Sequence, residues 1–146
     1  MAITQAVCGS FKQEILVGTH NFTNGTGDTF KLALYTSSAT MDETTTAYSA
    51  TNEVGASGTY SAGGGSLTSQ TPVQNGSGPI AACCSFSTLS FTTATITARG
   101  ALIYNSSKSN KAVCVLNFGS DQTSTAGTFT ITFPAQTKGN AILQIS

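Results

Sequence analysis

The chain has 146 residues, the length of one ordinary domain, so we expect a single domain over residues 1–146. Only 8% of the residues are charged, against about 25% in a typical soluble domain, and six basic side chains balance six acidic ones. The scattered Lys and Arg argue against a nucleic-acid partner, and no apolar run approaches the ~20 residues needed to insert into a membrane. Because zero net charge favours association, the composition indicates a protein that ends up bound to something.

The first eighteen residues, 1–18, are predicted to form an amphipathic N-terminal helix. Ile3, Val7, Phe11 and Ile15 recur every four residues, which places an apolar stripe along one helix face. A helix of about fourteen residues is marginally stable alone, so it must dock on its own sheet or on a neighbouring subunit. Phe11, in the middle of the stripe, is therefore a candidate assembly residue.

From residue 20 onward the apolar period changes to two, the period of half-buried strands. The predicted strands are 29–36, 85–91, 94–104, 112–118, 128–133 and 141–145. The short polar stretch 105–110 joins two of them into an antiparallel hairpin. Two long segments, 37–58 and 62–78, are rich in small and polar residues and are predicted to be extended surface loops.

Short strands separated by long loops favour two packed sheets. We therefore expect a mainly β fold, an antiparallel two-sheet sandwich of jelly-roll type, over residues 20–146 with the helix before it. A partly open barrel is the alternative fold.

No pattern in the chain predicts catalysis, a metal site or a cofactor. His20 is the only histidine and no C-x-x-C occurs, so zinc ligands at the usual spacings are missing. His20 is interpreted as a solvated or capping residue, and the adjacent acids Asp42 and Glu43 as turn residues. The cysteines are predicted to be buried or half-buried thiols in a reducing compartment: Cys8, Cys83, Cys84 and Cys114. We expect no enzyme activity.

Arg99 is a candidate assembly residue because it lies in the middle of a strand, at the end of an uncharged stretch. Residues 54–98 contain no Asp, Glu, Lys, Arg or His. An isolated Arg in a neutral sheet either anchors a subunit interface, where Arg is enriched, or pairs inside the chain with Glu53 or Asp121. Both interpretations stay open. The uncharged stretch, with its loop 62–78, is predicted to face a neighbour.

Loop aromatics are the other candidate assembly surface. Tyr48 and Tyr60 lie in or beside loops, where tyrosine supplies contact area at low entropic cost to protein or sugar partners alike. The alternative for these residues, and the favoured one for Phe22, is that they cover the ends of the core.

A resemblance to a known family rests on segments that span most of the chain. They are AITQAVCGSFKQEI (2–15), FKLALYTSSAT (30–40), TTAYSATNEV (45–54), TYSAGG (59–64), TARGALIYNSSKSNKAVCVLNFGSDQT (97–123) and GTFTITFPA (127–135). In these segments the chain resembles small virion proteins of tailed bacteriophages. The segments are a fold signature rather than a catalytic one, and no binding residue of the family maps onto this sequence.

The resemblance implies a capsid cement or decoration protein on the outside of a phage head, assembled in the host cytoplasm. Its expected partners are the major capsid protein and copies of itself in a homo-oligomer. The first alternative is a tail, neck or fibre component that binds another tail protein or a host glycan. The second alternative, a secreted carbohydrate-binding or adhesin-like module, predicts a disulfide that involves Cys114.

Overall fold

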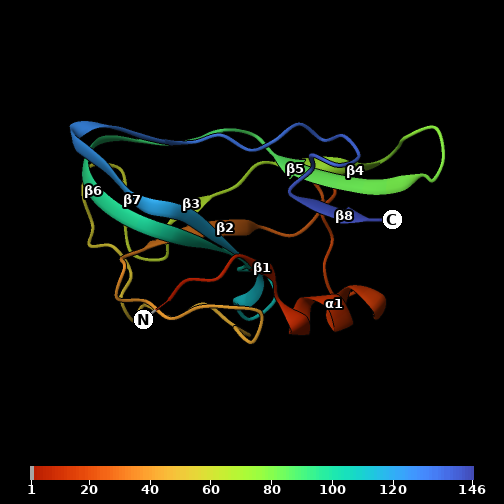
Figure 1. Cartoon of the computed structure of the whole chain (residues 1–146), viewed down its shortest axis with the longest axis horizontal. Helices are drawn as coiled ribbons and strands as arrows, with labels where there is room; N and C mark the ends of the chain where they lie inside the picture. The colour runs from red at the N-terminus through yellow and green to blue at the C-terminus, as the bar shows by residue number, and fades with distance from the viewer. Residues whose placement is uncertain (1) are drawn as a thin grey trace.

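A computed structural model of the chain describes residues 2–146 as eight strands and one short helix (Figure 1). In chain order they are β1 (Ala6–Val7), α1 (Gly9–Leu16), β2 (Phe30–Tyr35), β3 (Gly65–Ser66), β4 (Ser69–Asn75), β5 (Ala81–Phe86), β6 (Leu89–Asn105), β7 (Lys111–Ile131) and β8 (Leu143–Ile145). The strands form a five-stranded sheet in the order β1-β7-β6-β2-β3 and a three-stranded sheet in the order β4-β5-β8. The mainly β class and the two antiparallel sheets are confirmed, and within the described residues neither sheet closes on itself.

The N-terminal helix is shorter than predicted, because α1 covers only Gly9–Leu16. The prediction of a helix over 1–18 is wrong for the residues just before α1, which are extended. Ile3 forms a parallel bridge with Met41, and β1 pairs with the edge of β7. The edge of β7 offers this segment backbone partners, so the chain reaches Gly9 as a strand and then turns into the helix.

The larger sheet is built on one long hairpin of β6 and β7 (Figure 1). The predicted hairpin through 105–110 is confirmed. The predicted strands 112–118 and 128–133 are both parts of β7, which runs unbroken through the polar residues between them. The pairing of β6 with β7 shows register irregularities along this polar run, one of them between Ala98 and Gly100 of β6.

The segment 62–78 contains β3 and β4, so its prediction as a surface loop is wrong. β4 pairs with β5 from Ser69 to Asn75 through backbone hydrogen bonds. Its residues are mostly polar, so the sequence lacks the apolar alternation that predicts a strand. Gly64 enters β3 with φ +75°, and a Cβ there would lie 1.8 Å from the Leu32 carbonyl oxygen. Only glycine fits this close approach of two backbones.

The other predicted elements agree with the structure in part. The segment 37–58 contains no strand longer than an isolated bridge, but it is anchored rather than free, because Ala39, Met41 and Val54 are buried. The predicted strand 85–91 spans the end of β5 and the start of β6, and the strand predicted at 141–145 is β8.

One hydrophobic core joins both sheets. Phe22 and Phe30 stack with ring centroids 4.2 Å apart, and Phe86 of the smaller sheet lies 6.0 Å from Phe30. Phe22 is 6% exposed, so it covers the core, which is the interpretation favoured for it from the sequence. The four cysteines are buried and free, as predicted.

Candidate functional site

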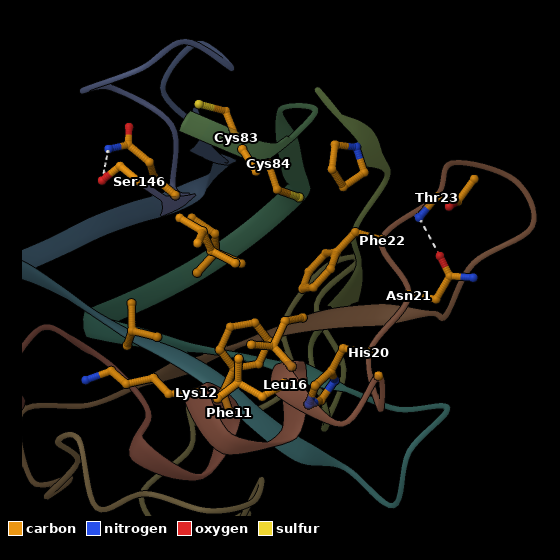
Figure 2. A pocket seen from close by; sticks show the side chains of 18 residues that line it. Phe11, Lys12, Leu16, His20, Asn21, Phe22, Thr23, Cys83, Cys84 and Ser146 are labelled. Atoms are coloured by element: carbon orange, nitrogen blue, oxygen red, sulfur yellow. Dashed lines mark hydrogen bonds between the residues drawn. The ribbon is translucent and has the colours of Figure 1, made fainter. Parts of the chain in front are cut away.

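An open apolar groove of about 910 Å³ lies between α1 and the smaller sheet (Figure 2). Phe11 and Leu16 line it from α1, and Cys84 lines it from β5 on the opposite side. Phe22 and His20, from the segment that follows the helix, line it as well. Lys12 is the only Lys, Arg, Asp or Glu among the eighteen described residues that form the lining. The groove can therefore take up apolar groups at little electrostatic cost.

The rim of the groove carries apolar side chains that lie in water. Leu16 is 85% exposed and Val17 is 75% exposed at the end of α1, and Ile145 on β8 is 64% exposed. A single exposed leucine is ordinary, but apolar side chains gathered at an apolar groove make this face a candidate interaction site. Sequence reasoning missed the groove, although the pair Leu16-Val17 before Gly18 was a visible signal.

A polar chain of four side chains, two buried and two half-buried, lies beside the groove and connects α1 to β6. The His20 side chain is 0% exposed, so its interpretation as a solvated residue is wrong. Its Nε2 lies 2.8 Å from Glu14 Oε2, and its Nδ1 lies 2.9 Å from Asn105 Nδ2. Asn105 Nδ2 also donates to Asp28 Oδ2 at 2.8 Å. The order of the hydrogen-bonded side chains in this polar chain is Glu14, His20, Asn105, Asp28.

The hydrogen bonds of Asn105 assign one tautomer to His20. Asn105 Oδ1 accepts the N–H of Ser107 at 3.0 Å, so its Nδ2 is the group that faces His20 and Asp28. An Nδ2–H donor requires an unprotonated Nδ1 on the imidazole. In this tautomer the proton lies on Nε2, which donates to Glu14.

Both carboxylates of this polar chain are stabilised in the charged form. Burial opposes the ionisation of Glu14, but hydrogen bonds from Lys111 and His20 outweigh it and hold its pKa below the usual value. Burial likewise opposes the ionisation of Asp28, and hydrogen bonds from Asn21 and Asn105 lower its pKa. The hydrogen bonds of these two carboxylates connect the α1 region to the end of the β6–β7 hairpin.

The candidate residues Tyr48 and Tyr60 bind a carboxylate of their own chain. Glu53 Oε2 accepts the hydroxyl of Tyr48 at 2.6 Å, and Oε1 accepts the hydroxyl of Tyr60 at 2.8 Å. Oε1 also accepts the N–H of Gly63 at 2.8 Å. Tyr60 is 1% exposed, which agrees with the alternative that it covers the core rather than with an exposed contact residue. Tyr48 is half-buried and stacks on Tyr104 at 4.8 Å, so it closes one end of the core.

The tyrosines around Glu53 resist ionisation. Burial, followed by the hydrogen bond to Glu53, raises the pKa of Tyr48 to about 12. Burial also raises the pKa values of Tyr35, Tyr60 and Tyr104, and the Glu53 charge adds to it in each. These four are all the tyrosines of the chain.

We expect an alkaline titration of the folded protein to show almost no tyrosinate absorbance at about pH 10, where an unperturbed tyrosine is half ionised. A raised pKa in the folded state contributes stability that is fully present below about pH 10. For Tyr48 that contribution is lost as the pH rises through about 12. Unfolding curves recorded between these pH values should show the loss. Tyrosinate formed near pH 10 without unfolding would contradict the expectation.

Arg99 pairs with Asp121, one of the two internal partners predicted for it. Its Nε lies 2.7 Å from Asp121 Oδ1 across the β6–β7 hairpin. The two side chains are 37% and 42% exposed, so the pair contributes at most about 1 kcal/mol. A role of Arg99 at a subunit interface stays a prediction.

Phe11 docks on its own chain. It is 6% exposed, and its ring lies 4.9 Å from His20 and 6.0 Å from Phe22. Of the two predicted docking arrangements for the apolar stripe, the structure has the one within the chain. The structure therefore does not bring Arg99, Tyr48, Tyr60 and Phe11 together into one surface: two are buried, one is half-buried and one is paired at the surface.

Comparison with known proteins assigns this chain to no family. It matches no protein-family model, no curated protein and no solved structure. Across residues 2–146, no three His, Cys, Asp or Glu side chains gather in a way that could hold a metal ion. No helix in the described part of the chain is long and apolar enough to cross a membrane.

Proposed function

We propose that this protein is a structural virion protein, a capsid cement or decoration protein that binds the outside of a phage head and bridges neighbouring capsomers. Its partners are the major capsid protein and copies of itself, and it joins the virion after synthesis in the host cytoplasm. The resemblance of the sequence to phage virion proteins supports this proposed location. The jelly-roll type of the fold and the lack of enzyme activity stay predictions within this proposal.

The observation that carries the proposal is the β4–β5 hairpin, which extends beyond the rest of the fold at the right of Figure 1. It lies within the uncharged stretch 54–98. It presents Val73, 43% exposed, and Ile80, 58% exposed, to solvent. An uncharged hairpin with exposed apolar side chains loses little hydration energy when a second protein covers it.

The hairpin is also anchored, which lowers the entropic cost of binding. Lys138 Nζ donates to the Pro79 carbonyl oxygen, and Gln136 Nε2 donates to the carbonyl oxygens of Thr71 and Cys83, at 2.8 and 3.0 Å. Both anchors come from the segment between β7 and β8. A docking element held in this way keeps its shape before and after contact with the capsid.

We expect the purified protein to bind capsids of its phage that were assembled without it and to raise their melting temperature. The double variant Val73→Asp with Ile80→Asp should weaken this binding by about 10- to 100-fold, because two apolar contacts become buried charges. The matched control Thr128→Asp changes an exposed residue on the β6–β7 hairpin and should bind like the wild type. Wild-type protein that does not bind at micromolar concentration would count against a cement role.

A tail, neck or fibre component is the alternative function, since an uncharged docking hairpin also serves a tail protein or a glycan. Copy number separates the two functions. Hundreds of copies per particle support cement, whereas roughly six to a few dozen support a tail position, because the symmetry of each structure fixes the number of sites.

A further inference from the structure

The dipeptide Asn-Gly occurs at two turns of the chain, Asn24-Gly25 and Asn75-Gly76. In this dipeptide the backbone nitrogen of the glycine can attack the side-chain amide carbon of the asparagine, because glycine has no side chain to hinder the approach. Every other asparagine precedes a residue with a side chain. These two turns are therefore the places where the chain can modify itself most readily, and the structure holds them in different ways.

The reaction is deamidation, which consumes only water. The glycine nitrogen loses its proton and forms a bond to the asparagine Cγ atom, the bond between Cγ and Nδ2 breaks, and ammonia leaves with that proton. The product is a five-membered succinimide ring. Water then opens the ring at one of its two carbonyl carbons, which gives either aspartate or isoaspartate. Each completed reaction replaces a neutral amide with a carboxylate.

The turn at Asn24-Gly25 leaves the reacting groups unhindered. Both residues are exposed and lie between α1 and β2, outside any strand. Neither the Asn24 side chain nor the Gly25 N–H has a hydrogen bond to another described residue, and a Cβ at Gly25 would meet nothing within 4 Å. The backbone N–H of Asn24 donates to Thr71 Oγ1 at 2.9 Å, and this bond leaves the amide free to rotate toward the Gly25 nitrogen.

The turn at Asn75-Gly76 is held by two neighbouring segments. Asn75 ends β4 and pairs with Ala81 of β5, and its Oδ1 accepts the N–H of Lys138 at 3.4 Å. A Cβ at Gly76 would lie 3.0 Å from Lys138 Cδ, so the Lys138 stem packs on the turn while its Nζ donates to the Pro79 carbonyl oxygen. Ring closure turns the asparagine backbone out of the extended conformation of a paired strand, so it would break these contacts.

We propose that Asn24 is a site of spontaneous deamidation in the folded protein and that Lys138 protects Asn75 from the same reaction. The new carboxylate arises outside the uncharged stretch 54–98, on the turn that hydrogen-bonds to Thr71 of β4. The chain has no net charge when it is made and becomes negative as it ages. The proposal goes beyond the proposed function and does not rest on it, because the reaction involves no partner.

Incubation of the folded protein in mildly alkaline buffer, followed by proteolysis and peptide mass spectrometry, measures the two rates separately. Asn24 should deamidate at least about 10-fold faster than Asn75, because reaction at Asn75 breaks contacts that reaction at Asn24 does not. In denaturant the two rates should agree within about threefold, since the fold no longer distinguishes the two dipeptides. Anion-exchange chromatography of the folded protein should show a more negative species accumulating with time.

Two variants assign the result to the named residues. Asn24→Gln keeps an exposed amide but needs a six-membered ring for the same attack, so the more negative species should not accumulate. Lys138→Ala removes the stem and the Nζ hydrogen bond and should raise the Asn75 rate about three- to ten-fold, with the Asn24 rate unchanged. Circular dichroism checks that both variants keep the fold.

Three results would overturn the proposal. The first is an Asn24 that stays intact in the folded protein although it reacts in denaturant. The second is an Asn75 that reacts as fast as Asn24, or faster, in the folded protein. The third is a folded Lys138→Ala variant in which Asn75 deamidates at the wild-type rate.

Discussion

Replacing Glu53 with alanine should lower the free energy of unfolding by about 3–5 kcal/mol, because buried donors lose their acceptor. The carboxylate accepts hydrogen bonds from the hydroxyls of Tyr48 and Tyr60 and from the N–H of Gly63. Tyr60 and Gly63 are buried, so their donors are costly to leave without an acceptor. Denaturant unfolding with linear extrapolation measures the loss.

Two further variants make the Glu53 result specific. Glu53→Gln keeps one carbonyl oxygen and should lose roughly half as much stability as Glu53→Ala. Glu43→Ala removes an exposed glutamate of the same segment and should change stability by less than about 0.5 kcal/mol. A loss below about 1 kcal/mol for Glu53→Ala would show that the tyrosine cluster does not hold this segment in place.

Replacing Asn105 with alanine should lower the free energy of unfolding by about 2–4 kcal/mol, since it leaves a cavity and unpaired buried groups. Asn105 is 0% exposed. Its amide donates to His20 Nδ1 and to Asp28 Oδ2, and its carbonyl accepts the N–H of Ser107. The same unfolding measurement applies, and a lowered melting temperature should accompany the loss.

The control for Asn105 is Asn140→Ala, which removes one exposed amide that donates to Thr137 Oγ1 at 2.9 Å. It should change stability by less than about 0.5 kcal/mol. Nitrogen NMR provides a readout that packing alone does not move: the neutral imidazole of His20 should carry its proton on Nε2. A proton on Nδ1 would contradict the hydrogen-bond assignment of the polar chain.

The strands that sequence predicted well are those whose burial alternates or that lie in the core. The strands at 29–36 and 94–104 were predicted because apolar side chains follow the period of the backbone there, and both lie in the larger sheet. β4 and the middle of β7 were missed. They are edge segments with polar residues on both faces, so backbone bonds alone define them.

The candidate site was hard to predict because its partners are far apart in the chain. His20 meets Asn105, 85 positions away, and no local motif connects the two. Glu53 was predicted only as a possible partner of Arg99, and nothing in the sequence connected it to Tyr48 and Tyr60. A loop tyrosine looks the same in sequence whether its hydroxyl meets water or a buried carboxylate.

The position of β2 in the larger sheet has a consequence for synthesis of the chain. β2 is the apolar strand Phe30–Tyr35, and its neighbour in the sheet, β6, is complete only at Asn105. The ribosome adds those ~70 residues in about 4–14 s at its usual rate. Until then β2 can pair in this sheet with the two-residue strand β3 but not with its long partner β6. Nascent chains of this protein should therefore be most prone to aggregation, and most dependent on chaperones, just before the β6–β7 hairpin emerges.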